Sequence, residues 1–165
     1  FGSENRIYKY DYKKRSFKSI NIKKQEDKGS DVTKYRVQKI IAFSEREALV
    51  ATRRDGVYVL DYQTMRLKRL FSGSNNILQG AYLSSNGYIY LSFWGQGLFC
   101  YEKTGKFIKR YTKENSDLTN NYVLDIIEKK GYLWRLTEEE STVWNCLMRI
   151  SPISTILLEI KIRYP

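Results

Sequence analysis

The stretch LQGAYLSSNGYIYLSFWGQGLFCYEKTGKFIKRY, residues 78–111, contains short apolar or alternating runs separated by turn residues. The runs are LQGAY, YIYLSF, LFCYE and KFIKRY, and the breaks between them are SSNG, GQG and KTG. Asn86-Gly87 and Thr104-Gly105 have the composition of tight turns, because glycine supplies the positive φ that such turns demand. The stretch therefore predicts a small antiparallel sheet of four short strands.

The same pattern occurs elsewhere in the chain. Residues 37–70, VQKIIAFSEREALVATRRDGVYVLDYQTMRLKRL, align with it without a gap at an offset of 41 residues (78 − 37). A third copy begins at residues 123–134, VLDIIEKKGYLW, and the back half of an earlier copy occupies residues 7–20, IYKYDYKKRSFKSI. Four strands per unit of about 41 residues are the signature of a β-propeller blade. The sequence predicts an all-β fold, a partial β-propeller of four-stranded antiparallel blades, with about two whole blades and two half blades.

The alignment also sets the domain boundaries. We expect residues 1–134 to form the partial propeller and the polar residues 23–34 to form a surface loop. Because propeller rings contain roughly four to eight blades, this number of blades is expected not to close a ring, and the isolated chain to be marginal or self-associating. The first residues hold neither an initiating Met nor an apolar leader, so we expect the interior of something longer. The expected blades lie near residues 6–22, 35–72, 76–113 and 121–134.

Alternation within the aligned strands predicts which side chains form the core. The residues expected to be buried are Ile40, Val50, Val57, Leu91, Leu98 and Phe99.

Composition excludes several kinds of chemistry. The 165 residues carry a net charge of +11, and 42% are hydrophobic, which is enough for a core. Histidine is absent, which removes His-based acid/base catalysis and Ser-His or Cys-His nucleophile pairs. Cys100 and Cys146 are too few for a disulfide framework or a metal cluster, and no apolar run approaches the ~20 residues of a membrane span. We expect no catalytic residue, no metal and no cofactor in this chain.

The units resemble the two-component regulator propeller repeats found in the extracellular sensor region of hybrid two-component histidine kinase/response regulator proteins. VLDIIEKKGYLW and GQGLFCYEKTGKFIKRY match the family's strings V-x-x-I-x-E-D-x-x-G-x-L-W, G-G-L-x-x-Y-D and T-G-x-F-x-x-Y. The copy at residues 37–70 is looser, because Gln63-Thr64-Met65 lacks the Thr-Gly pair. The resemblance covers about residues 6–134.

This resemblance implies a function for the intact parent protein. It would be a periplasmic sensor region of an inner-membrane protein, usually a homodimer, that detects oligosaccharides and controls polysaccharide-use genes. The remaining propeller blades would be partners of this chain. The kinase and its phospho-accepting histidine are not in these residues, so the chain itself is expected not to be an enzyme.

The repeat pattern fails after Trp134, where RLTEEESTVWNCLMRISPISTILLEIKIRYP replaces the expected second half of the blade. If the codons from Arg135 onward are read in a shifted frame, they can encode ATDGGGINRL. In that frame the codons of residues 138–140, EEE, encode glycines. We interpret residues 135–165 as an out-of-frame tail without selected chemistry, in which residues 153–162 form at most a weakly supported strand. A divergent last blade is the alternative interpretation.

Candidate ligand contacts lie in the loop between the second and third strands of each blade. In a propeller this loop and the loop joining consecutive blades lie on one face, where ligands usually bind. Trp94 can stack on a sugar ring and Gln96 can hydrogen-bond hydroxyls. Arg53 and Arg54, at the equivalent position, can pair with an acidic group. The structural alternative is a Trp packed between blades and solvated arginines.

Other polar residues are expected to shape turns. Asp11, Asp61 and Glu102 recur at one blade position, and this recurrence indicates a turn role rather than catalytic carboxylates. The Asn pairs at residues 75–76 and 120–121 are expected turn formers, because Asn tolerates left-handed backbone geometry.

Three functional hypotheses follow. The favoured one is a fragment of a ligand-sensing propeller, the second is a propeller scaffold for a protein partner, and the third is a fragment of a propeller lyase or glycosidase. The third needs converging acids, and none recurs. Nucleic-acid binding is not expected, because the basic run KKR at residues 13–15 has no accompanying recognition motif.

Overall fold

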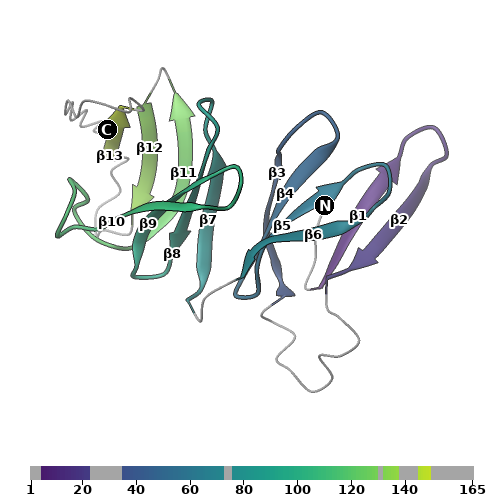
Figure 1. Cartoon of the computed structure of the whole chain (residues 1–165), viewed down its shortest axis with the longest axis horizontal. Coiled ribbons are helices and arrows are strands. Elements are labelled where there is room, and N and C mark those ends of the chain that lie inside the picture. Colours follow the sequence, from purple (N-terminus) through teal and green to yellow (C-terminus); the bar gives the residue numbers. More distant parts are fainter. Residues whose placement is uncertain (1–4, 23–34, 73–75, 130–131, 138–144, 150–165) are drawn as a thin grey trace, which may run out of the picture. The chain divides into compact units, whose positions relative to one another are not determined.

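The structure is a computed structural model that describes residues 5–22, 35–72, 76–129, 132–137 and 145–149. The regular elements in these ranges are β-strands (Figure 1), as the repeat pattern predicts. The chain divides into two compact units, Phe1–Leu78 and Gln79–Pro165, and each unit is described by itself.

Unit 1 contains a two-stranded sheet and a four-stranded sheet, both antiparallel. They correspond to the predicted half blade and the first whole blade, and the four-stranded sheet has the simple order β3-β4-β5-β6. Consecutive strands pair because each is joined to the next by a short turn. The strands are β1 (Arg6–Asp11), β2 (Ser16–Asn21), β3 (Val37–Ala42), β4 (Glu47–Thr52), β5 (Gly56–Asp61) and β6 (Leu67–Ser72).

Unit 2 contains the second whole blade and a three-stranded sheet of order β11-β12-β13. The sequence predicted a half blade of two strands ending at Trp134, but β12 continues to Thr137 and β13 pairs with it. The run at residues 153–162 lies outside the described residues. The strands are β7 (Leu78–Leu83), β8 (Tyr88–Phe93), β9 (Gly97–Glu102), β10 (Phe107–Tyr111), β11 (Val123–Lys129), β12 (Tyr132–Thr137) and β13 (Asn145–Arg149).

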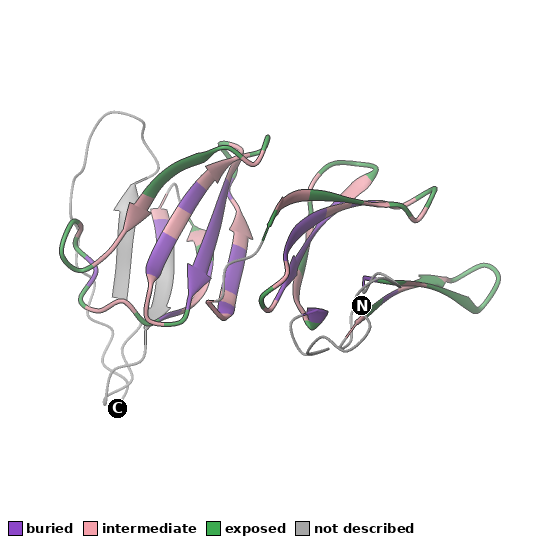
Figure 2. Ribbon diagram, turned by 60° about the horizontal axis from the view of Figure 1, so that its bottom comes forward, coloured by how far each residue is buried: buried purple, intermediate pink, exposed green. Residues whose placement is uncertain are grey.

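The second strand of each whole blade is its most buried element (Figure 2). In β4 and in β8 the last five residues are all buried, so both faces of these strands are covered, which explains their nearly continuous apolar sequences. The fourth strands β6 and β10 are mainly half-buried or exposed and carry the basic residues. Charged side chains on an outermost strand discourage pairing with other chains.

Each unit has its own apolar cluster between its two sheets. In unit 1, Ile7 and Ile22 of the half blade pack against Val50 and Leu60 of the whole blade. In unit 2 the cluster joins side chains of β8 and β9 to β11 and β12, among them Tyr90, Leu98, Cys100, Val123, Ile126 and Leu133. Cys100 is a free, buried thiol, and burial raises its pKa, in keeping with a small core residue.

Most of the predicted core residues are buried, but Ile40 is not. Val50, Val57, Leu91 and Leu98 are buried, as predicted. Phe99 is only half-buried. Ile40 is 37% exposed although it lies directly opposite the buried Val50, so the prediction for Ile40 was wrong.

The exposure of Ile40 has a simple cause. Cross-strand partners point to the same face of a sheet, so Ile40 shares with Val50 the face on which the half blade packs. Within the described residues, that half blade consists only of β1 and β2, which align with third and fourth strands. The first and second strands that would lie beside β3 are not among the described residues.

Acidic residues that end the third strands fold the following turns, as predicted. The Oδ1 atom of Asp61 accepts hydrogen bonds from the backbone N of Gln63 at 2.9 Å and of Thr64 at 2.6 Å. Oδ1 of Asp11 accepts in the same way from the next turn residues, Lys13 and Lys14. These backbone donors, that of Thr64 first for Asp61, lower the pKa of each carboxyl.

These turns also require a left-handed residue, and the chain supplies an unfavourable one twice. In unit 2 the left-handed residue is Gly105, with φ of +89°, three residues after Glu102. In unit 1 it lies one position later in the turn, at Arg15 (φ +47°) and Met65 (φ +58°). Residues other than Gly pay roughly 1–2 kcal/mol for this conformation.

We expect Arg15→Gly to stabilise unit 1 by about 0.5–1 kcal/mol, because relief of the left-handed strain exceeds the added flexibility of the unfolded chain. Arg15 is exposed, so little packing is lost. Lys14→Gly in the same turn is the control and should destabilise, because φ is not positive at Lys14. Urea unfolding followed by circular dichroism measures both variants, and equal destabilisation by the two would contradict this account.

Candidate functional site

The predicted ligand contacts lie in two equivalent turns, one in each unit. Arg53 and Arg54 follow β4 in unit 1, and Trp94 and Gln96 follow β8 in unit 2. The backbone of Arg53 is fully engaged, since its N donates to the Arg36 carbonyl and its carbonyl accepts from the N of Leu78, each at 2.8 Å. Arg53 is half-buried and Arg54 is exposed.

In unit 1 the turn is held by an arginine from the fourth strand. Arg69 lies directly opposite Tyr58, and its guanidinium carbon is 5.2 Å from the centre of the Tyr58 ring. Its Nη2 donates to Asp55 Oδ2 at 2.7 Å and to the Tyr58 hydroxyl at 2.6 Å. The Tyr58 hydroxyl in turn donates to Asp55. Three side chains thus form a closed hydrogen-bonded group beneath the turn.

Unit 2 repeats this arrangement with neutral partners. Arg110 lies opposite Phe99, with its guanidinium carbon 5.2 Å from the ring centre. Its Nε donates to the backbone carbonyl of Gln96 at 2.8 Å, and its Nη2 donates to the side-chain Oε1 of Gln96 at 2.9 Å. The sequence predicted that Gln96 binds sugar hydroxyls, but here its amide oxygen accepts from Arg110. A ligand contact by Gln96 stays a prediction.

The Tyr58 group predicts a specific alkaline sensitivity. Burial, followed by the hydrogen bond to Asp55, raises the pKa of Tyr58 from 10.0 to about 12. The neutral hydroxyl is therefore favoured in the folded state, so its contribution is complete below pH 10.0 and is lost as the pH rises toward 12. Melting temperatures between these values should fall more steeply for the wild type than for Tyr58→Phe. Parallel curves would show that Tyr58 does not contribute.

Trp94 forms an exposed aromatic corner with a residue that the sequence analysis did not select. Its ring centre lies 5.2 Å from that of Tyr122, with the two planes at 80°. Both side chains remain accessible, Trp94 at 44% and Tyr122 at 42%. We refer to these two residues as the Trp94–Tyr122 corner. Tyr122 directly follows the Asn pair at residues 120–121, so its place in the inter-blade loop was a usable signal.

Backbone contacts fix the two loops that carry this corner. The N of Gly97 donates to the Asn121 carbonyl at 2.9 Å, which ties the turn after β8 to the loop before β11. Asn120 Oδ1 accepts from the backbone N of Tyr122 at 2.8 Å, the turn-forming role predicted for it. Gly95 lies against the Tyr122 ring, where an added Cβ would stand 3.5 Å from it. The aromatic rings are therefore held on an ordered framework.

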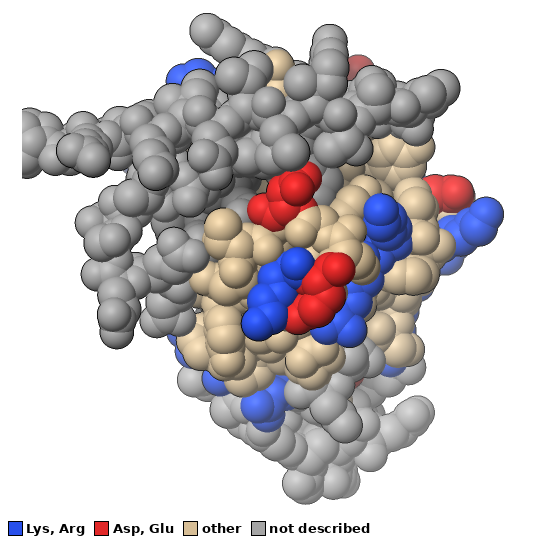
Figure 3. Space-filling model, turned by 90° about the vertical axis from the view of Figure 1, so that its left-hand side faces the viewer, with Lys and Arg blue, Asp and Glu red and all other residues tan. Residues whose placement is uncertain are grey.

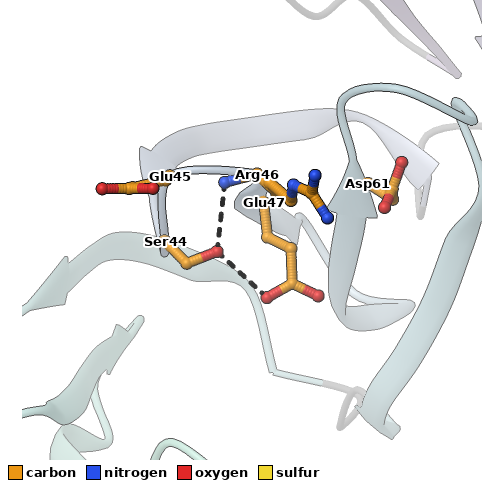
Figure 4. Close-up of a pocket in the computed structure, with 5 residues that line it drawn as sticks. All are labelled: Ser44, Glu45, Arg46, Glu47 and Asp61. Atoms are coloured by element: carbon orange, nitrogen blue, oxygen red, sulfur yellow. Dashed lines mark hydrogen bonds between the residues drawn. The ribbon is translucent and has the colours of Figure 1, made fainter.

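A hollow of about 360 Å³ lies at the opposite end of β4 (Figure 4) and is a weaker candidate. Its polar groups serve the turns that form it: Ser44 Oγ lies 3.2 Å from Glu47 Oε2, and Asp61 is used by its own turn. In the same view the side chain of Arg46 extends toward Asp61, while Glu45 points away. Its lining residues are all polar or charged and are partly engaged by these turns, so we do not assign a site there.

Surface charge gives no sign of a polyanion site on the face shown in Figure 3. On the described part of that face, basic and acidic side chains lie next to one another. In unit 2, Lys106 Nζ pairs with Glu102 Oε1 at 3.7 Å. Within the described ranges, no group of three or more acidic or cysteine side chains is placed to hold a metal ion. The described residues also contain no helix long and apolar enough to span a membrane.

Comparison with solved structures identifies the fold. The chain is similar to the extracellular domain of a protein from B. thetaiotaomicron, BT4673, described as a hybrid two-component system, with a TM-score of 0.64 and 17% identity over 87% of this chain and 20% of that one. The extracellular domain of BT3049 from the same organism gives 0.62 and 18%, over 82% of this chain and 20% of that one. The computationally designed protein Ika4 gives 0.58 and 11%, over 82% and 76% of the two chains.

These likenesses, with the observed sheets, show that the chain is a partial β-propeller. It spans about a fifth of the length of the two B. thetaiotaomicron domains. No family model matches the sequence, and no curated protein matches it significantly.

Proposed function

We propose that this chain is part of the ligand-sensing propeller of a hybrid two-component sensor, and that the Trp94–Tyr122 corner contacts an oligosaccharide. The observation that carries the proposal is a pair of accessible aromatic rings on ordered loops. Two solved structures with a similar fold are extracellular domains of proteins described as hybrid two-component systems, and this likeness supports the sensor assignment.

Aromatic rings suit carbohydrate because a sugar ring has an apolar C–H face and polar edges. Such a face can lie on an exposed indole or phenol ring, while hydroxyls are hydrogen-bonded at the rim. Glu114 and Asn121 lie in the loop that precedes Tyr122 and supply polar groups near the corner; their own contact is 3.4 Å long.

The same proposal covers the parent protein. The parent would be an inner-membrane protein that acts as a homodimer. Its propeller would lie in the periplasm, and its kinase would be a separate domain of the same protein. Binding of an oligosaccharide would then control polysaccharide-use genes. In this proposal the 165 residues bind the ligand and transmit the signal, and catalysis is performed by other domains.

The test measures binding of neutral malto-, cello- and xylo-oligosaccharides and acidic oligogalacturonides to the 165-residue chain by calorimetry. Trp94→Ala and Tyr122→Ala should each weaken binding of the recognised sugar by roughly tenfold or more, which is about 1.4 kcal/mol. Tyr12→Ala is the matched control, because Tyr12 is an 85% exposed aromatic residue in unit 1.

All three variants should keep the melting temperature of the wild type within a few degrees, because the rings are accessible. Unchanged affinity in Trp94→Ala would remove this residue from the site. If no sugar in the panel binds the wild type, the sensor proposal fails and the protein-scaffold hypothesis gains.

A further inference from the structure

The turn after β8, WGQG at residues 94–97, has no charged residue, whereas the equivalent turn in unit 1 reads RRDG. The arginine on the fourth strand of this blade, Arg110, is already engaged, because its Nε and Nη2 donate to the backbone carbonyl and the side chain of Gln96. The hydrogen bonds of unit 2 instead bring the charges of one loop to the Trp94–Tyr122 corner. This loop, residues 112–122, lies between β10 and β11 (Figure 1).

Asn121 links the carboxylate of Glu114 to the end of the loop that carries Tyr122. Its Oδ1 accepts from the backbone N of Lys113 at 2.8 Å, and its Nδ2 donates to Glu114 Oε2 at 3.4 Å. Its own carbonyl accepts from the N of Gly97 at 2.9 Å, so the same residue ties the loop to the turn after β8. The carboxylate therefore contacts the residue that immediately precedes Tyr122 in the chain.

The carboxylate of Glu114 remains open to further hydrogen-bond donors. Its contact with Asn121 is longer than a normal hydrogen bond, and the residue is exposed. A hydrogen bond from the Thr112 side chain, followed by one from its own backbone N, lowers the pKa of Glu114, so the group is ionised at neutral pH. An ionised carboxylate accepts at about four lone-pair positions and donates at none. It therefore suits a partner rich in hydroxyl donors.

The cation of this loop is not held in the same way. Lys113 contributes its backbone N to Asn121, but its Nζ makes no hydrogen bond or ion pair within the described ranges. An exposed lysine side chain samples many rotamers, so its charge is spread around the loop. The charge that is fixed beside the Trp94–Tyr122 corner is therefore the negative charge of Glu114.

We propose that Glu114 is a specificity-determining residue of this corner, which accepts hydrogen bonds from the hydroxyls of a neutral oligosaccharide and repels uronic or sulfated sugars. This inference rests on the proposed oligosaccharide contact and adds the class of sugar. The C–H face of the sugar lies on the aromatic rings, while hydroxyls at its rim donate to the carboxylate. An acidic sugar in the same place brings two negative charges together, which disfavours binding. Discrimination thus combines an attractive element with a repulsive one.

Calorimetry with matched pairs of sugars tests the inference on the 165-residue chain. Malto- and cello-oligosaccharides are compared with the same chains oxidised at C6 to uronic acids, and oligogalacturonides are compared with their methyl esters. The wild type is expected to bind a neutral member at least about tenfold more tightly than its acidic counterpart, a difference of about 1.4 kcal/mol. Salt at about 1 M should reduce this preference, because the Debye length then falls to about 3 Å.

Glu114→Gln removes the charge and keeps the shape of the side chain. It should weaken binding of the neutral sugar by roughly fivefold and tighten binding of the acidic one, so that the preference falls to within about threefold, because charge-assisted hydrogen bonds become neutral ones. Lys113→Gln, in the same loop, is the matched control and should retain the preference for the neutral member. Both residues are exposed, so the melting temperatures of the two variants should remain close to that of the wild type.

The outcomes separate this inference from the proposed function. Tighter binding of the acidic member by the wild type, or an unchanged preference in Glu114→Gln, would overturn the role of Glu114 and leave the aromatic contact standing. If neither the neutral nor the acidic sugars bind the wild type, the proposed function fails and this inference fails with it.

Discussion

Gly97→Ala is expected to unfold the β7–β10 sheet or to destabilise it by at least about 3 kcal/mol, more than left-handed strain alone would cost. Gly97 has φ of +79°, and a Cβ at this residue would stand 2.2 Å from the carbonyl oxygen of Tyr111. That oxygen belongs to the backbone of the paired strand β10, so it cannot move without breaking the ladder. Urea unfolding monitored by circular dichroism measures the loss.

Gly87→Ala is the matched control for this prediction. Its φ of +87° is equally left-handed, but the nearest atom to an added Cβ is the flexible end of Lys103, at 3.8 Å. Gly87→Ala should therefore cost only the conformational strain, about 1–2 kcal/mol. Equal losses in the two variants would show that backbone crowding at Gly97 is unimportant.

Arg69→Met is expected to destabilise unit 1 by about 2–3 kcal/mol, because it leaves a largely buried carboxylate without its cation. The Asp55 side chain is only 10% exposed and accepts from Arg69 at 2.7 Å. The hydroxyl of Tyr58 remains as a donor to Asp55, which limits the loss. Methionine retains most of the packing of the arginine stem.

The corresponding variant in unit 2, Arg110→Met, provides the comparison. Arg110 donates to neutral acceptors of Gln96, so its removal leaves no unpaired charge. The loss of stability should be only about 1 kcal/mol. Adding Asp55→Asn to Arg69→Met should recover part of the loss, since the unpaired charge is then gone. A double variant that is no more stable than Arg69→Met would show that the charge of Asp55 is not the cause.

The sequence by itself determined the strands and the turns between them. Strand alternation and the glycine turns depend on residues that are close together in the chain, and the 41-residue offset (78 − 37) is the repetition of these local patterns. All three can therefore be read from the sequence. Asp61 could be assigned to a turn for the same reason, because its hydrogen-bond partners lie two and three residues away. The likeness to propeller domains agrees with this part of the prediction.

Only the tertiary structure decided which of these residues are covered and which are accessible. Gln96 accepts from Arg110, which lies on a different strand, and Tyr122 meets Trp94 across two loops. Ile40 has the alternation of a core residue but is exposed, because its cover depends on strands of another blade. Local pattern specifies backbone geometry, whereas burial and side-chain partnership depend on surfaces brought together by the packing of sheets, and no spacing along the chain encodes these.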